Sequence, residues 1–493
     1  MINTQNLWGI VCFIIVLFTL GCKENKTKQV QIKNNLQLHV AAHLEKAKID
    51  DEVPDVFQVS VREAEMNFKI PAFQSAAVAK YDGKWLLIGG RTVGLHSLDN
   101  DPPAFRKDKA NDSIWVIDLE SQQSIGVPVP KEYGRNLSAT SQQYYQVNEK
   151  LYLAGGFTVK DTSAVNNWTS DLFFEIDLPS LIDYVTNNAT IPLEQVFTKV
   201  IQNPYVQVTG GEMMVVNNNF YIIGGQNYQQ AYVPGYTGVY TNAIRKFSLL
   251  NNNGIWQLSD TLTLEDSENL HRRDFNMTET VMYGNDSIGA VIYGGVFTDN
   301  EMAYRNPVYI NGLVSGIPTI EIDTSFHQKT NLYTGAKIQA ALFYNDKGWF
   351  YNHTTFLGGI SYMTLKPGAD SLSVPEMGNE LPFSNVISSF LTDGEFYSIE
   401  KVQLPPNEIL PTYLGTNATF FANPGFALKG HPEILDLNKI FNNIDFNQPV
   451  SIGYMYGGIL SPVPNTFTSN GHMSTSTNKK LYEVFMTMKI PGS

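Results

Sequence analysis

The chain has 493 residues and a net charge of -13, with 43% hydrophobic, 12% aromatic and 16% charged residues. This composition excludes a disordered chain, because the apolar fraction is ample for a buried core. The acidic balance leaves no basic stripe for phosphates, which argues against a nucleic-acid partner. We therefore expect a large folded body that does not bind nucleic acid.

The chain opens with an apolar stretch of 14 residues, from Leu7 to Leu20. It is too short to span about 30 Å of hydrocarbon as a helix, and it indicates the core of a signal peptide over residues 1–21. The end of this stretch and the two residues after it, Thr19-Leu20-Gly21-Cys22, resemble a bacterial lipobox. The resemblance implies that Cys22 is lipidated and becomes the first residue of the mature chain. The alternatives are an ordinary cleaved signal or a short membrane anchor.

The residues after Cys22 indicate the membrane in which the protein is anchored. Lys23 stands where an aspartate would be expected in an inner-membrane lipoprotein, and by this resemblance the protein is sorted to the outer membrane. The pair Lys23-Glu24 also resembles the surface-export tethers of Bacteroidetes-type lipoproteins. We expect a protein anchored in the cell outer membrane through lipid, facing the periplasm or the surface. The other cysteine, Cys12, lies in the signal peptide, so the mature chain has no disulfide.

Residues 22–52 are predicted to form a tether. Within it, four apolar residues follow a helical spacing of four, four and three: Leu36, Val40, Leu44 and Ala47. This pattern predicts a short helix that covers one end of the folded body, with an amphipathic membrane anchor as the alternative.

Six times the remaining chain runs an aliphatic or aromatic stretch into a glycine pair. Successive pairs are 66, 69, 70, 64 and 99 residues apart. The pairs are Gly89-Gly90, Gly155-Gly156, Gly224-Gly225, Gly294-Gly295, Gly358-Gly359 and Gly457-Gly458. A recurrence at tens of residues is typical of an architecture that repeats one supersecondary unit. Residues 53–493 are therefore expected to form one body.

Each repeat can be divided into four strands. In the first repeat a tight turn at Asp82-Gly83 separates two apolar runs, which is a strong hairpin signal. The sixth repeat ends before its fourth strand, whereas Asp55 to Val61 forms a strand-like run with no partner near it. We expect this N-terminal strand to complete the last unit and close a ring, which removes exposed sheet edges. The predicted fold is all-β: a six-bladed β-propeller of four-stranded blades.

With these glycine pairs the chain resembles the kelch-type six-bladed β-propellers, which include the central domain of galactose oxidase and bacterial sialic acid mutarotases. Glycines are needed where a neighbouring backbone or side chain approaches a strand closely. The resemblance does not extend to copper-radical oxidation, which needs a cysteine crosslinked to a tyrosine, because the propeller has no cysteine. Histidines with metal-binding spacing are also absent from the sequence, so we predict no metal and no cofactor.

The long loops that follow the second strands share one face, and function usually lies on such loops. Six of the eight arginines lie in these loops or at the start of an inner strand: Arg91, Arg106, Arg135, Arg272, Arg273 and Arg305. Their planar donors suit a carboxylate, phosphate or sulfate. The alternative is that each arginine bridges loops to an aspartate.

The densest group is His271-Arg272-Arg273-Asp274. In an extended segment Arg272 and Asp274 would point one way and His271 and Arg273 the other, so only one pair could reach the channel. Nearby, Tyr228, Tyr232, Tyr236 and Tyr240 either stack on sugar rings or pack their loop against itself. The predicted ligand-binding residues are Arg91, Arg135, His271, Arg272, Arg273, Asp274 and Arg305. Because they come from three different blades, Arg135, Arg272 and Arg305 are expected to bind an anionic or hydroxyl-rich ligand at this face.

Two functional classes follow. The first is a monomeric, lipid-anchored binding protein whose partner is a glycan, another anionic molecule or an envelope protein. The second is implied by the mutarotase resemblance: a mutarotase, epimerase or lyase that acts on an acidic sugar through Asp274, His271 or Glu301 with the arginines. The sequence alone assigns no catalytic residue, since an enzyme needs a carboxylate or histidine within hydrogen-bond reach of its substrate.

Overall fold

The computed structural model describes residues 57–97, 103–187, 190–233, 238–281, 288–344, 349–366, 368–375, 381–392, 398–406, 409–443, 448–464 and 471–488. The predicted signal peptide, Cys22 and the tether with its helix lie outside the described residues. Among the residues it does describe, none of the helices combines the length and the apolar character needed to cross a membrane.

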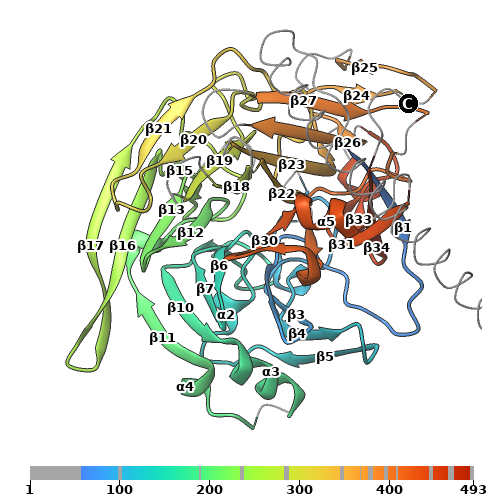
Figure 1. Ribbon diagram of the computed structural model, residues 1–493. Helices are drawn as coiled ribbons and strands as arrows, with labels where there is room; N and C mark the ends of the chain where they lie inside the picture. Colours follow the sequence, from blue (N-terminus) through green and yellow to red (C-terminus); the bar gives the residue numbers. More distant parts are fainter. Residues whose placement is uncertain are drawn as a thin grey trace, which may run out of the picture.

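Six four-stranded antiparallel sheets form the blades of a β-propeller, which confirms the predicted fold (Figure 1). Blade 1 consists of Ala77–Tyr81 (β2), Lys84–Ile88 (β3), Ser113–Asp118 (β4) and Gln123–Pro128 (β5). Blade 2 consists of Gln143–Val147 (β6), Lys150–Ala154 (β7), Leu172–Asp177 (β10) and Phe197–Gln202 (β11). Blade 3 consists of Glu212–Val216 (β12), Asn219–Ile223 (β13), Ala243–Asn252 (β16) and Ile255–Glu265 (β17).

The other three blades follow the same order, and the last one closes the ring. Blade 4 consists of Asn276–Val281 (β18), Ile288–Tyr293 (β19), Val308–Asn311 (β20) and Thr319–Ile322 (β21). Blade 5 consists of Lys337–Tyr344 (β22), Trp349–Ile360 (β23), Phe383–Thr392 (β26) and Ser398–Gln403 (β27). Blade 6 consists of Ala418–Ala422 (β28), Pro449–Gly457 (β31), Leu481–Met488 (β34) and Phe57–Glu63 (β1). All of β1 pairs with β34, so the predicted closure by an N-terminal outer strand is confirmed.

Short two-stranded ladders and helices lie between the strands of the blades. Two-residue ladders join Phe157–Thr158 (β8) to Trp168–Thr169 (β9), Gln226–Asn227 (β14) to Val239–Tyr240 (β15), Thr364–Leu365 (β24) to Leu372–Ser373 (β25), and Ile459–Leu460 (β32) to Ser476–Thr477 (β33). In the described part of the chain, five helical segments lie outside blade 6: Lys107–Lys109 (η1), Gly134–Leu137 (α2), Leu178–Thr186 (α3), Leu193–Val196 (α4) and Pro204–Val206 (η2). Within blade 6, Gly471–Ser474 (η4) lies between β32 and β33.

The glycine pairs join each blade to the next. Both glycines of every pair have positive φ, a conformation that other residues rarely adopt. The second glycine donates its N–H to a carbonyl just before the inner strand of the following blade, at N–O distances of 2.7 to 2.9 Å. The acceptors are Ala139, Val208, Arg272, Leu332, Leu414 and Phe73. The predicted close approach at the glycines is therefore made by the neighbouring blade.

A second ring of hydrogen bonds runs around the axis where the inner strands begin. The residues Ser75, Ser141, Gly210, Asp274, Thr334 and Asn417 each accept from the next one, and Ser75 donates to Asn417 to complete the circle. The N–O distances lie between 2.7 and 3.5 Å. This backbone ring holds the six inner strands in register at one level of the central channel.

Blade 6 contains an insertion that contributes to the 99-residue spacing of the last two glycine pairs. The basal insertion, residues 424–443, comprises Pro424–Phe426 (η3), Ala427–Leu428 (β29), His431–Asp436 (β30) and Leu437–Asn443 (α5). Strand β30 pairs in parallel with the inner strand β22 of blade 5. In Figure 1, β30 and α5 lie in the middle of the ring.

The basal insertion also contacts two further blades. Lys80 of blade 1 lies 2.9 Å from the Glu433 carboxylate, and His431 pairs with Glu279 of blade 4. The hydrogen bond with Glu279 raises the pKa of His431, which outweighs the opposing effect of burial. The insertion therefore ties blades 1, 4 and 5 together at the end of the channel opposite the long loops.

Candidate functional site

A cavity of about 180 Å³ lies at the loop-rich end of the channel, and its walls follow the repeat. One set of lining residues directly follows the glycine pairs: Arg91, Phe157, Gln226, Ile360 and Ile459. A second set comes from the residues that precede the inner strands, which are Gln74, Thr140, Thr209, Arg273, Tyr333 and Thr416. Five members of the backbone ring also line the cavity: Ser75, Ser141, Gly210, Asp274 and Asn417. Every blade thus contributes to one central site.

Arg91 is a buried cation in the cavity wall. The residue is 5% exposed, and its Nε and Nη1 atoms have no hydrogen-bond partner in the structure. Its guanidinium lies 4.5 Å from the centre of the Phe105 ring. Burial lowers the pKa of Arg91 to about 10, which leaves the side chain charged at neutral pH. A buried charge without a partner is unfavourable, so this side chain favours an anion in the cavity.

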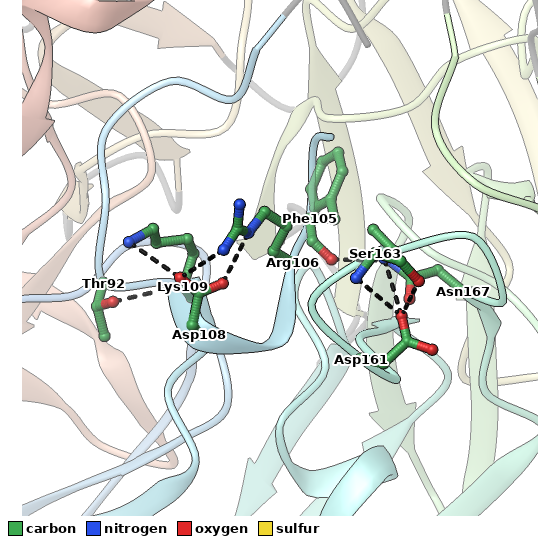
Figure 2. A network of polar contacts seen from close by, with 9 residues as sticks. Thr92, Phe105, Arg106, Asp108, Lys109, Asp161, Ser163 and Asn167 are labelled. Atoms are coloured by element: carbon green, nitrogen blue, oxygen red, sulfur yellow. Dashed lines mark hydrogen bonds and ion pairs between the residues drawn. The ribbon is translucent and has the colours of Figure 1, made fainter. Parts of the chain in front are cut away.

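Contacts between the loops of blades 1 and 2 hold Phe105 and its neighbours in place (Figure 2). Its carbonyl accepts a hydrogen bond from Asn167 Nδ2 at 2.8 Å, and the N–H of Lys107 donates to the carbonyl of Asp161 at 3.1 Å. Arg106 pairs with Asp108 at 2.9 Å and lies outside the cavity lining. The loops therefore fix an aromatic platform under the arginine.

Arg273 and Asp274 form an ion pair that lines the same cavity. Burial disfavours the charge of Arg273, but the Asp274 carboxylate outweighs this effect and raises the pKa of Arg273. The expectation that the two side chains point to opposite sides is wrong. Asp274 has a φ of +52°, so the chain turns there and is not extended.

Four predicted site residues lie outside the cavity lining. His271 stacks on Tyr240, with ring centres 3.9 Å apart. Arg272 is 2% exposed and donates Nη1 to the carbonyls of Gly294 and Asn306, both at 2.9 Å. Its contacts brace blade 4.

The other two of these residues, Arg135 and Arg305, each lie over an aromatic ring. The Arg135 guanidinium is 3.4 Å from the centre of the Trp168 ring. The Arg305 guanidinium is 4.1 Å from the Tyr362 ring, and its Nε donates to the carbonyl of Gln328 at 2.8 Å. The structure therefore brings together only Arg91, Arg273 and Asp274 of the seven predicted residues. Within the described ranges, acidic, histidine and cysteine side chains form no group of three suited to a metal ion.

The tyrosine loop contributes an aromatic wall. Tyr228 and Tyr232 stack on each other, with ring centres 5.7 Å apart, and both line the cavity. His96 packs against Tyr232 at 4.6 Å between ring centres. Packing of the loop against itself and stacking on a sugar ring are therefore compatible roles, because Tyr228 and Tyr232 pack together and still line the cavity. Tyr236 lies outside the described residues.

A simple sequence signal could have identified more of the lining. In five blades the residue directly after the glycine pair reaches the cavity. Charge singles out Arg91, whereas Phe157 and Gln226, at the same position in blades 2 and 3, have no charge to mark them. The glycine repeat therefore marks the site as well as the fold.

Comparisons with known proteins assign no function to the chain. No protein-family model matches the chain, and no curated protein matches it. Among solved structures the chain is similar to one described as "Structure of YjhT", with 11% identity and a TM-score of 0.42. The match covers 84% of this chain and 99% of the other.

Proposed function

We propose that the protein is a kelch-type binding protein, lipid-anchored in the outer membrane, whose cavity takes a small anionic, hydroxyl-bearing molecule such as a sugar acid or the end of an acidic glycan. The observation behind this proposal is Arg91, a buried guanidinium in the cavity wall with two unpartnered donor atoms. Arginine binds carboxylates through paired, planar hydrogen bonds.

The rest of the cavity supports a compact polar ligand. Its volume of about 180 Å³ is below the range of roughly 300–1,000 Å³ typical for drug-sized ligands, which suggests one sugar ring. Phe105 and Tyr232 offer flat surfaces, and the Asp274 carboxylate can accept hydrogen bonds from hydroxyl groups.

Arg91→Met is expected to weaken binding of D-glucuronate by about ten- to a hundred-fold, because a hydrogen bond to a charged group contributes roughly 1.5–3 kcal/mol. The melting temperature should stay the same or rise, since an unpaired buried charge is removed. Titration calorimetry and thermal unfolding measure the two effects. Arg106→Ala, which alters an ion-paired arginine outside the lining, is the matched control. Unchanged affinity for glucuronate in Arg91→Met would refute the anion site.

The second candidate is an enzyme that isomerises an acidic sugar. One observation favours it: Asp274 and His96, both capable of proton transfer, line the cavity with Arg91. Exchange spectroscopy by NMR separates the two functions. An enzyme accelerates the interconversion of the two anomers of glucuronate, whereas a binding protein leaves that rate unchanged.

The membrane anchor is a separate part of the proposal, supported by the sequence Thr19-Leu20-Gly21-Cys22. Cys22→Ser is expected to release the protein from the membrane fraction, because stable anchoring requires two or more acyl chains. Metabolic labelling with a fatty-acid analogue should tag the wild type and not the variant. Equal labelling of both proteins would rule out lipidation at Cys22.

A further inference from the structure

Two more polar side chains in the cavity wall lack partners. Gln226 is 6% exposed and Thr416 is 2% exposed, yet Gln226 Oε1 and Thr416 Oγ1 form no hydrogen bond in the structure. With Arg91, three wall residues from blades 1, 3 and 6 have buried polar atoms without partners. Buried polar groups in folded proteins are almost always hydrogen-bonded. Such a cluster around one cavity therefore indicates contacts that a ligand supplies.

The position of Gln226 is set by its backbone and not by its side chain. Its N–H donates to the carbonyl of Thr209 at 2.9 Å, and it pairs with Tyr240 in the β14–β15 ladder. Gln226 directly follows its glycine pair, as Arg91 does in blade 1. The backbone thus presents two polar side chains at equivalent places, on either side of the blade that contributes Phe157.

We propose that Gln226 is a specificity-determining residue whose amide oxygen accepts a hydrogen bond from a hydroxyl or N–H group of the ligand, while the ligand's anionic group lies at Arg91. The Thr416 hydroxyl is a third contact. This inference rests on the proposed anion-binding function and narrows it: the cavity selects acids that also have a hydrogen-bond donor on the ring.

The lining from blades 5 and 6 is partly apolar. Ile360 and Ile459 occupy the equivalent positions in blades 5 and 6 and are 1% and 2% exposed. Neither can form a hydrogen bond through its side chain, and Leu95 lines the cavity as well. A ligand whose acid group lies at Arg91 therefore meets an acceptor at Gln226, while blades 5 and 6 present these apolar side chains beside the Thr416 hydroxyl.

Two acids with similar rings test the proposal. D-glucuronate has ring hydroxyl groups, and cyclohexanecarboxylate has none. The wild type should bind glucuronate at least ten-fold more tightly, because an apolar ring leaves the polar wall unpaired. Gln226→Leu should weaken glucuronate about ten-fold and leave cyclohexanecarboxylate unchanged. Its melting temperature should not fall, since the Gln226 amide oxygen has no hydrogen bond to lose.

Gln202→Leu is the control, because this glutamine pairs with Asp171 at 2.9 Å and lies outside the cavity lining. If Gln226→Leu fails to fold, Gln226→Asn serves instead. Its side chain is one methylene shorter, so its amide lies farther from the ligand, and the preference for glucuronate is expected to fall in the same way. A preference that is identical in wild type and the Gln226 variants overturns the specificity role, even where Arg91→Met still weakens binding. Failure of the wild type to bind either acid overturns this inference together with the anion site.

Discussion

Gly155→Ala is expected to lower the free energy of unfolding by more than about 4 kcal/mol, or to prevent folding. Gly155 has a φ of +63°, where an L-residue is strained by roughly 1–2 kcal/mol. A Cβ at this position would also collide with the carbonyl oxygen of Val208 and lie 2.7 Å from Gln143 Oε1. The collision falls on the hydrogen bond between Gly156 and Val208 that joins blades 2 and 3. Because the ring is closed, one blade cannot move without disturbing both neighbours.

Gly254→Ala is the matched control for this variant. Gly254 has a φ of +87°, but a Cβ there would meet nothing within 4 Å. It should therefore show only the conformational effect of about 1–2 kcal/mol. Denaturant unfolding, followed by circular dichroism, measures both variants. Similar losses of stability in the two would mean that the contact between blades contributes little.

Deletion of residues 23–62 is expected to destabilise the propeller strongly, whereas deletion of residues 23–50 should leave its melting temperature unchanged. The longer deletion removes nearly all of β1, whose residue Val59 is fully buried. It also removes two hydrogen bonds of 2.8 Å between the Val59 backbone and the side chain of Gln403 in blade 5. The outer edge of β34 then becomes free to pair with other chains.

Thermal unfolding and light scattering distinguish the two truncations. The longer one should melt at a lower temperature and aggregate at its exposed edge. Equal melting temperatures for both truncations and the mature chain would show that the terminal strands do not hold the ring together.

The fold could be predicted because its signals are local and repeated. A turn such as Asp82-Gly83 adopts the positive φ values, +48° and +72°, that a tight hairpin requires. The closing strand could be predicted because the sixth repeat lacks its fourth strand, whereas the strand-like run from Asp55 to Val61 has no partner near it in the sequence. Both inferences need only periodicity and a count of strands.

The site could be predicted only in part, because charge alone does not show where a side chain points. Arg91 and Arg272 are both buried arginines, but one faces the cavity and the other donates to carbonyls of its own blade. The turn at Asp274 reversed the expected alternation. The parallel pairing of β30 with β22 joins segments almost a hundred residues apart, and nothing in either segment specifies such a partner.

The basal insertion has a consequence for the stiffness of the ring. It contacts blades 1 and 4, which face each other across a ring of six, and it pairs with the inner strand of blade 5. Opposite blades are thereby connected directly and not only through the blades between them. Such a cross-brace resists flattening of the ring, so the spacing of the inner strands is held at both ends of the channel.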